Sequence, residues 1–578
     1  MDYDANISSE SSPIATAGSR DLMMDIYSGF QSSITQIPPT TNPYSFNVRP
    51  GTPPPRPQPA RLSTIGKHIL TVATVSIDAR CGTQTITRPL DASVLEPASK
   101  ADLDRIQIRH PLPLMRGPRK LTRMRYLVAT FYRRLMALVL FLNLATICSM
   151  IAYHVSSPSA FTYANAATAT GVNLMTAVLM RQEHVINLLF HLACSLPRSA
   201  PLWLRRLAAK MAYNNGGVHA GAAISALGWY VLHVAFVGSQ FDGEVWQKDL
   251  LLVVTAATLT LLIAIISLAH PTFRRKHHDV WELSHRFGGW TAIALVWVQI
   301  ILIAVFDAQS THQPIGTSLV HLPTFWFLIV ITSCLVYPWL RLRRLPVSAN
   351  RLSSHATQLH FTNRTLATCR GVRISTNPLL QNHGFATIPN PAGPLASSND
   401  LEKGSAAPLT ALPPLPARRG YTLLVSKAGD FTTSLIHDPP PRLYIRGAPT
   451  IGVMRLSSLF TPILIITTGS GIGPCLSWLT CHRHHPKRIV WSARSPAQTY
   501  GAEIVRRVKE ADREAVVIDT MATGTPDLVT LGWGVFKGMG GGRGGEAVMC
   551  ISNHKVTRNV VFGFEGRGVP AFGAIFDS

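Results

Sequence analysis

The chain has 578 residues, of which 47% are hydrophobic and 15% are charged, and its formal net charge is +24. This length exceeds what one hydrophobic core usually supports, so we expect two or three structural units. The Lys and Arg residues lie beside apolar runs, which favours a membrane protein and argues against a nucleic-acid partner. The eight cysteines form no CxxC pair, so neither a disulfide framework nor a cysteine-ligated metal is expected.

The N-terminal region lacks a long apolar run. Residues 1–115 are rich in Ser, Thr and Pro, with TPPPRPQP at 52–59, and this composition predicts a mostly disordered cytoplasmic tail. The first residues, MDYDANISSESSP, are acidic and polar, so we expect no secretory signal. The segment HILTVATVSID at 68–78 has strand character but suggests no role.

Six apolar stretches follow, each close to the twenty residues that a membrane-spanning helix needs. They cover about residues 135–155, 160–180, 217–238, 248–269, 286–306 and 319–340. The second is rich in Ala and Thr and could run on to residue 193. We therefore expect a six-helix transmembrane bundle over residues 130–345.

Basic residues alternate between the connecting loops. Clusters of Arg and Lys precede the first stretch, separate the second from the third and the fourth from the fifth, and follow the sixth, whereas the other three loops hold only Lys248. This alternation predicts a multi-pass integral membrane protein with both termini in the cytoplasm. The expected partner is the lipid bilayer, and the expected location is the plasma membrane.

Histidines on two of the stretches suggest haem ligation. His219 and His233 are fourteen residues apart, which is nearly four helical turns, so both rings face one way about 21 Å apart. His285 opens the fifth stretch at the depth of His219, and ionisable groups at such depths usually have a function. We predict one haem b between His219 and His285. A second haem on His233 has less support because its counterpart is Gln299, and chance spacing of packing histidines is the alternative for all three.

The pattern changes from residue 350 onward. Alternating segments such as QLHFTN and GVRIST predict a small β-barrel over residues 350–455. The stretch 389–418 is rich in Pro, Ala and Ser and predicts an inserted loop. The barrel resumes with GYTLLVS.

A glycine-rich turn follows the barrel. TPILIITT at 461–468 predicts a buried strand, and the turn after it consists of Gly469, Ser470, Gly471, Ile472, Gly473 and Pro474. In a strand, glycine turn and helix of this kind, backbone N–H groups approach a pyrophosphate. Strands and helices continue to alternate, so we predict a parallel α/β nucleotide-binding domain over residues 456–578. Arg494 either holds a 2′-phosphate or is a surface arginine.

These features together resemble the ferric reductase and NADPH oxidase superfamily. The resemblance rests on the histidines of the third and fifth stretches, on His383-Gly-Phe-Ala-Thr and on Gly471-Ile-Gly-Pro. The chain is most similar to fungal TmpA-type integral membrane proteins, in the segments VHAGAAISALGW, WELSHRFGGW, HGFATIP, TTGSGIGPCLSWL and GVPAFGAIFDS. The C-terminal half is also similar to fungal nonribosomal-peptide-synthetase-like reductases.

The resemblance implies an α-helical membrane bundle of six transmembrane helices, a cytoplasmic β-barrel flavin domain and an α/β nicotinamide-binding domain. It implies FAD in the barrel and NADPH or NADH in the α/β domain, with Cys550 near the nicotinamide and Phe576 covering the flavin. The implied flavin site consists of His383, Phe385, Thr387, Gly429 and Thr432.

The expected function is therefore that of a membrane flavo-haem oxidoreductase, which passes electrons from NAD(P)H through FAD to a transmembrane haem and on to an unidentified small-molecule acceptor. For TmpA-type proteins the resemblance also implies a part in developmental signalling. Two alternatives stay open: a catalytically reduced reductase-like membrane protein with a signalling or interaction role, and a one-haem reductase that acts on a lipophilic product.

Overall fold

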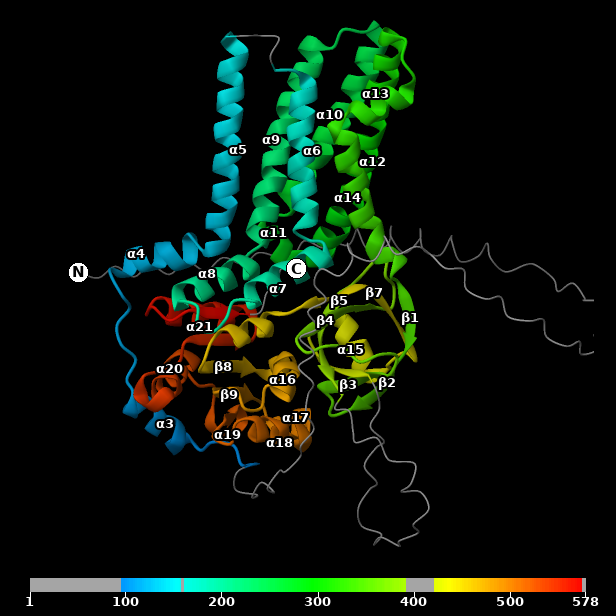
Figure 1. The fold of residues 1–578 in the computed structure, drawn as a ribbon. Coiled ribbons are helices and arrows are strands. Elements are labelled where there is room, and N and C mark those ends of the chain that lie inside the picture. The colour runs from blue at the N-terminus through cyan, green and yellow to red at the C-terminus, as the bar shows by residue number, and fades with distance from the viewer. Residues whose placement is uncertain (1–94, 157–160, 391–419, 574–578) are drawn as a thin grey trace, which may run out of the picture. The chain divides into compact units, whose positions relative to one another are not determined.

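The computed structural model describes residues 95–156, 161–390 and 420–573 (Figure 1). All of these residues belong to one compact unit, Ala79–Ser578. The predictions for residues 1–94, for most of the inserted loop and for Phe576 lie outside the described residues.

The apolar stretches form long helices whose bounds are close to those expected, except that α12 begins earlier and ends later than the stretch predicted at 286–306. They are α5 (Phe131–Ser156), α6 (Tyr163–Leu179), α9 (Gly216–Gln240), α10 (Val245–Leu268), α12 (His278–Thr311) and α14 (Pro323–Leu340). Within the described residues, five of them are long and apolar enough to cross a membrane, and the exception is α6 with its 17 residues. By this measure, five helices are able to span a membrane, where the sequence predicts six.

Two amphipathic helices connect α6 to α9. They are α7 (Glu183–Cys194) and α8 (Leu202–Tyr213). The second apolar stretch does not continue to residue 193, because the chain turns at Met180 and a new helix begins after Gln182, whose side chain accepts a hydrogen bond from the His184 N–H at 2.5 Å. Shorter helices occur at α4 (Arg119–Arg123), the π-helical η1 (Met124–Val128), α11 (Pro271–Lys276) and α13 (Ile315–His321).

The first sheet is antiparallel, with the strand order β1-β7-β4-β5-β6-β3-β2. Its strands are β1 (Arg343–Pro346), β2 (Ser348–Arg351), β3 (Ala356–Phe361), β4 (Arg370–Ser375), β5 (His383–Pro389), β6 (Tyr421–Ser426) and β7 (Arg442–Ile451). The edge strands β1 and β2 are separated in the chain by Val347 alone, so the sheet has to curl until its edges meet. The result is the small barrel that the alternating segments predict, and α15 (Asp430–His437) packs against it.

The second sheet is entirely parallel, with the order β10-β9-β8-β11-β12. Its strands are β8 (Ile463–Thr468), β9 (Lys487–Ala493), β10 (Val516–Asp519), β11 (Ala547–Ile551) and β12 (Ala571–Gly573). The helices are α16 (Ile472–Cys481), α17 (Pro496–Tyr500), α18 (Ala502–Ala511), α19 (Thr520–Thr523), α20 (Leu528–Gly538) and α21 (His554–Glu565), with short 3₁₀ turns η3 (Val453–Leu459), η4 (Gly469–Gly471) and η5 (Gly540–Gly542).

Both faces of the parallel sheet are buried, and the alternation along β8 shows how. Ile463 and Ile465 belong to the core formed with α16 and α18, whereas Leu464 and Ile466 belong to the core formed with α20 and α21. All four side chains are fully buried. A strand covered on both sides has to be apolar at every position, which explains the continuous run ILII in the sequence.

Residues 95–115 differ from the disordered tail that we expect from composition. They contain α3 (Lys100–Arg109), whose first turn is capped by the Ser99 hydroxyl, which accepts from the Asp102 N–H at 3.2 Å. Leu103 is buried in the core beside α20, and the Ala98 N–H donates to the Val517 carbonyl oxygen at 2.7 Å. A capping box and a buried leucine therefore order this part of the chain on the α/β layer.

Candidate nucleotide-binding site

A cleft of about 780 Å³ lies at the carboxyl ends of the parallel strands. Strands β9 and β10 extend the sheet on one side of β8, and β11 and β12 extend it on the other, so the strand order reverses between β8 and β11. Ligands of open parallel sheets bind outside the strand ends at such a switch point. The residues that line this carboxyl-edge cleft include Thr468, Gly469, Ser492, Arg494, Ser495, Tyr500, Met521, Asp527 and Asn553.

The predicted glycine turn borders the cleft through Gly469. Gly469 has a φ of +53°, in the left-handed region that favours glycine. A Cβ atom on Gly471 would lie 2.3 Å from the Ile551 carbonyl oxygen, so only glycine fits between the ends of β8 and β11. The Thr467 hydroxyl donates to the same oxygen at 2.9 Å. The turn is therefore fixed where α16 begins, and a helix N-terminus favours anions.

The same turn contacts the barrel. The Ser426 hydroxyl, at the end of β6, donates to the Ser470 hydroxyl at 2.6 Å. A Cβ atom on Gly473 would lie 3.3 Å from the Leu424 side chain, so α16 packs closely on β6. Pro474 lies in the first turn of α16, where its missing N–H leaves no intrahelical hydrogen bond unmade. These contacts hold the glycine turn beside the barrel.

Arg494 follows β9 and lies on the cleft wall. Its Nε donates to the Met521 sulfur at 3.4 Å, and its side chain is otherwise exposed. The next residue is fixed by Asp519, which accepts from the Ser495 N–H at 2.9 Å. Arg494 is thus placed where a cleft-bound ligand could reach it, and both of its expected roles stay open.

Cys550 does not lie in the cleft, contrary to the position that the resemblance implies. It is fully buried in β11, in the core beside α21, with its sulfur 4.0 Å from the Thr557 hydroxyl. Burial raises the pKa of the Cys550 thiol to about 12. A neutral thiol inside a core is not available to a nicotinamide ring.

The residues of the expected flavin site are only partly brought together. His383 stacks on Phe431, with ring centroids 4.0 Å apart, and so joins β5 to α15. Phe385 is half-buried against the barrel core. Thr387 is fully buried, and its hydroxyl donates to the Arg370 carbonyl oxygen at 3.0 Å, so it is not presented to a flavin.

The turn before α15 is formed by the other two expected flavin residues. The Thr432 hydroxyl accepts from the Gly429 N–H at 3.0 Å and from the Ala428 N–H at 2.8 Å. Thr432 therefore stabilises the turn that starts α15. A Cβ atom on Gly429 would meet no described heavy atom within 4 Å, and the same holds for Gly384 on β5. The surface beside the His383 and Phe431 stack is thus open.

The histidines of the apolar helices differ in their freedom to bind iron. His233 is fully buried, its Nδ1 is 2.9 Å from the Tyr163 carbonyl oxygen and its Nε2 contacts the Gln299 side-chain nitrogen. Both ring nitrogens are engaged, so His233 does not present a free ligand for an outer haem. Gln299 occupies the expected counterpart position and closes this site.

His219 and His285, the pair predicted for the inner haem, each keep at least one ring nitrogen without a hydrogen bond to a described residue. The Nδ1 atom of His219 is 2.8 Å from the Ala177 carbonyl oxygen. The His285 ring stacks on Trp281, with centroids 5.9 Å apart, and its buried Nδ1 has no hydrogen-bond partner among the described residues. The described residues contain no group of three or more His, Cys, Asp or Glu that could hold a metal ion. Ligation by this pair stays a prediction.

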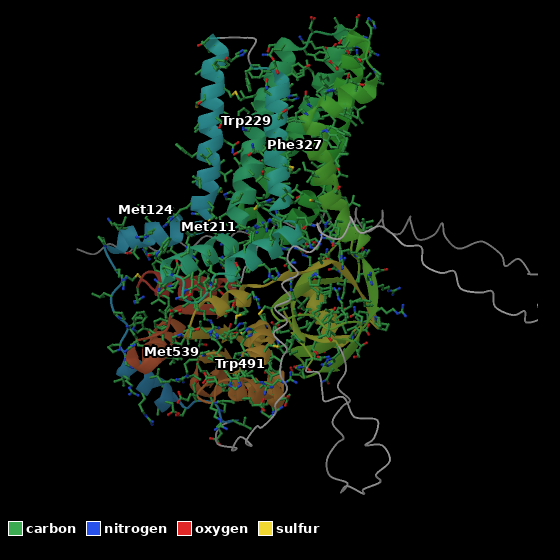
Figure 2. The ribbon with its side chains drawn as sticks, viewed as in Figure 1. Met124, Met211, Trp229, Phe327, Trp491 and Met539 are labelled. Carbon is green, nitrogen blue, oxygen red and sulfur yellow. The ribbon has the colours of Figure 1, made fainter. Side chains whose placement is uncertain are left out.

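Sequence reasoning missed several polar side chains of the cleft. Ser492 lies near the end of β9 and Asn553 is the second residue after β11, so their positions at the carboxyl edge were a usable signal. Trp491 was not predictable in the same way: its indole N–H donates to the Gly469 carbonyl oxygen at 3.0 Å and so supports the glycine turn from β9 (labelled in Figure 2).

The chain is similar in sequence to adenylate-forming reductases. A family model described as adenylate-forming reductase 03009, C-terminal domain, matches residues 453–578. The chain is 37% identical over 458 residues to adenylate-forming reductase 03009 of Coprinopsis cinerea and 36% identical over 456 residues to adenylate-forming reductase 06235 of the same fungus. Each alignment covers 79% of this chain and 41% of the relative, so the chain spans about two-fifths of the relatives' length.

Solved structures match more weakly. The flavohemoglobin from Malassezia yamatoensis with bound FAD and haem has a TM-score of 0.33 and 14% identity, over 70% of this chain and 98% of that one. The ferredoxin-NADP⁺ reductase from Plasmodium falciparum with 2′P-AMP has a TM-score of 0.28 and 9% identity, over 41% of this chain and 98% of that one. TM-scores this low do not establish a common fold.

These relatives correct the family prediction. They are adenylate-forming reductases and not ferric reductases, NADPH oxidases or TmpA-type proteins, so the main resemblance is wrong. The function taken from it, electron transfer from NAD(P)H through FAD to a transmembrane haem, is wrong with it, and the TmpA-type developmental role loses its support. The secondary resemblance, to fungal nonribosomal-peptide-synthetase-like reductases, agrees with these relatives. Over residues 453–578 the chain is therefore similar to the C-terminal domain of an adenylate-forming reductase.

Proposed function

We propose that this chain is a reductase-like membrane protein that binds a nicotinamide adenine dinucleotide in the carboxyl-edge cleft and acts mainly through that binding, in a signalling or interaction role. The observation that carries the proposal is the glycine turn between β8 and α16, at the switch point of a parallel sheet. The close approach of Gly471 to Ile551 fixes this turn, and the reductases matched by the chain support a nicotinamide ligand.

Three side chains expected at cofactor sites are buried or already hydrogen-bonded within the protein. The Cys550 thiol is buried behind the sheet, and the Thr387 hydroxyl is bonded inside the barrel. His233 is closed by Gln299 and the Tyr163 carbonyl. A cleft that keeps its binding turn while the Cys550 thiol of the same sheet is turned into the core favours binding over rapid turnover.

The barrel fits a flavin on one face. His383 and Phe431 would hold the ring system beside the open positions at Gly384 and Gly429. A bound flavin supplies the ability to accept a hydride and release electrons singly. Burial lowers the pKa of His383 below its usual value, and the charges of Glu282 and Asp279 offset this only in part, so the imidazole is neutral at pH 7 and can act as a hydrogen-bond acceptor.

The long apolar helices support placement in a bilayer, and the alternation of basic loops supports both termini on the cytoplasmic side. In the most apolar 18-residue stretch of α5, only 6% of the residues are buried, and side chains such as Phe141 and Leu144 are more than half exposed. Such a surface is costly in water and favourable in lipid. The protein should stay in the membrane pellet after alkaline carbonate extraction, and release into the supernatant would contradict this placement.

Dinucleotide binding is tested by titrating the purified protein with NADPH and with NADH while its tryptophan fluorescence is recorded. Gly471→Ala should weaken both ligands more than about tenfold, because its Cβ has no room beside Ile551. The matched control is Gly384→Ala, which adds the same methyl group in open space and should change neither affinity. Absence of binding by the unsubstituted chain would overturn the proposal.

The same titration decides between the two roles of Arg494. A charge-assisted contact to a 2′-phosphate contributes about 2 kcal/mol, so Arg494→Ala should weaken NADPH about thirtyfold and leave NADH unchanged. Equal effects on both ligands would indicate a surface arginine. Dye reduction by the purified protein then measures turnover, and steady rates on the order of 10 s⁻¹, ordinary for an enzyme, would contradict a role based on binding alone.

A further inference from the structure

The polarity of α8 is inverted relative to that of a water-exposed helix. Trp203, Leu207 and Met211, spaced four residues apart on one face, are 66%, 43% and 47% exposed. The opposite face buries Arg205 and Ala209. A surface helix normally exposes its charges and buries its large apolar side chains. An outer face of Trp, Leu and Met therefore indicates an apolar surrounding.

The helical segment before α5 shows a similar outer face. Leu121, Met124 and Val128 of α4 and η1 are 54%, 56% and 56% exposed. Thr122 is buried, with its hydroxyl donating to the Arg116 carbonyl oxygen at 2.8 Å, so the segment is held from its other side. Figure 2 labels Met124 on η1 and Met211 on α8. We call the six exposed apolar side chains of α4–η1 and α8 the apolar collar. They are Leu121, Met124, Val128, Trp203, Leu207 and Met211.

The two parts of the collar lie at the same end of the long helices. η1 ends at Val128, just before α5, and α8 ends at Tyr213, just before α9. α5 and α9 run side by side in the same direction, because the space beside Gly217, Gly221 and Gly228 is filled in turn by residues 132–135, 136–139 and 147. Both collar segments therefore lie where the apolar helices begin, at the level of a bilayer interface.

This end of the molecule is strongly basic. Between residues 105 and 241 the sequence has a single acidic residue, Glu183. Lys120, Arg123 and Arg125 are exposed on α4 and η1, beside the apolar side chains. Basic residues next to an apolar stripe are the pattern of helices that lie in the headgroup layer of a membrane with anionic lipids.

We propose that α4–η1 and α8 form an interfacial anchor, in which the apolar collar enters the acyl boundary and Lys120, Arg123 and Arg125 bind the headgroups of anionic phospholipids. The inference rests on the membrane placement proposed above and adds the lipid class and the surface that recognises it. The occupant is lipid because the collar is continuous with α5, most of whose residues are themselves exposed.

The anchor is tested with the full chain in lipid nanodiscs, carrying a solvent-sensitive fluorescent amino acid at position 124 or 211. Position 521 is the matched control, because Met521 is also an exposed methionine, at 62%, but lies at the carboxyl-edge cleft. Emission at 124 and 211 should be blue-shifted and quenched by lipids with a nitroxide headgroup, whereas emission at 521 should not. Equal emission and quenching at all three positions would overturn the anchor even if carbonate extraction confirms that the chain spans the membrane.

The lipid class is tested by comparing discs of phosphatidylcholine with discs that also contain phosphatidylglycerol. Each basic residue near an anionic surface favours the bound state about fivefold, so quenching at 124 should rise with phosphatidylglycerol. The triple variant Lys120→Glu, Arg123→Glu, Arg125→Glu should abolish that rise, and the equal charge change in Arg351→Glu, Arg364→Glu, Arg483→Glu should not. A rise that survives the first variant, or a blue shift seen only with two chains per disc, would show that the occupant is not anionic lipid.

Discussion

The buried guanidinium of Arg205 makes the sharpest stability prediction. Its Nη1 and Nη2 donate to the two Glu546 carboxylate oxygens at 2.7 and 3.1 Å, its Nη1 to the Leu459 carbonyl oxygen at 2.6 Å and its Nε to the Ala200 carbonyl oxygen at 2.9 Å. In Arg205→Met, two carbonyl oxygens lose a donor, and Glu546 keeps, among the described residues, the hydrogen bond from the Thr461 N–H at 2.8 Å and the charge of the nearby Arg206.

The cost follows from these groups. Removing one partner of a buried ion pair costs about 3–5 kcal/mol. The Glu546 side chain is 26% exposed and can regain some hydration, so we expect about 3 kcal/mol. The loss is local to the contact of α8 with η3 and the start of β8, where it should increase amide hydrogen exchange about 100-fold.

Hydrogen–deuterium exchange of the purified chain measures this effect directly, in peptides covering residues 457–463. The matched control is Arg506→Met, because Arg506 also pairs with carboxylates, Glu503 among them at 2.7 Å, but is 46% exposed. Exposed pairs contribute about 1 kcal/mol or less. If Arg205→Met accelerates exchange in this segment no more than Arg506→Met accelerates exchange in α18, the buried pair does not hold α8 as we argue.

Two further predictions concern the α/β layer. Leu103→Ala should cost about 3 kcal/mol by leaving a cavity beside α20, and should release α3 to limited proteolysis, while Ile108→Ala, at a position 79% exposed, should not. His485 should make stability depend on pH. Burial is the main cause that lowers its pKa from the ordinary 6.5 to about 4. As the pH drops, the unfolded chain is therefore protonated at this histidine before the folded chain is, and stability falls between pH 6.5 and 4. The melting temperature of His485→Gln should lose this part of its pH dependence, and an unchanged profile would contradict the assignment.

The regular elements could be predicted from the sequence because each has a strong local signal. A run such as ILII in β8 fits only a strand covered on both faces, and the apolar stretches are long enough to exclude most alternatives. Gly471 could also be placed, because a strand followed by a glycine turn and a helix leaves little choice of geometry.

The side-chain directions within motifs could not be predicted in the same way. Successive residues of a strand point to opposite faces, so a motif similarity that places Thr387 or Cys550 near a ligand fails if the strand presents the neighbouring residue instead. Both side chains are directed into cores. The role of Arg205 was also hidden, because its partner Glu546 is 341 residues away and its charge looked like one of several in a basic loop.

The ion pair between Arg205 of α8 and Glu546 lies at the amino ends of the parallel strands, opposite the cleft at their carboxyl ends. The two proposed binding surfaces are therefore at opposite ends of the sheet. Thr461 precedes β8 and Glu546 precedes β11, so Arg205 acts at the amino ends of these strands, whereas the glycine turn follows the carboxyl end of β8. Six residues of strand span about 20 Å, and all residues of β8 except Thr468 are buried in a closely packed core. Loosening α8 should therefore leave the turn in place.

Arg205→Met should bind NADPH within about twofold of the unsubstituted chain, even though its collar is less firmly held. If its affinity instead falls in parallel with the exchange protection of residues 457–463, the sheet transmits the state of α8 to the cleft, and the two surfaces form one coupled system.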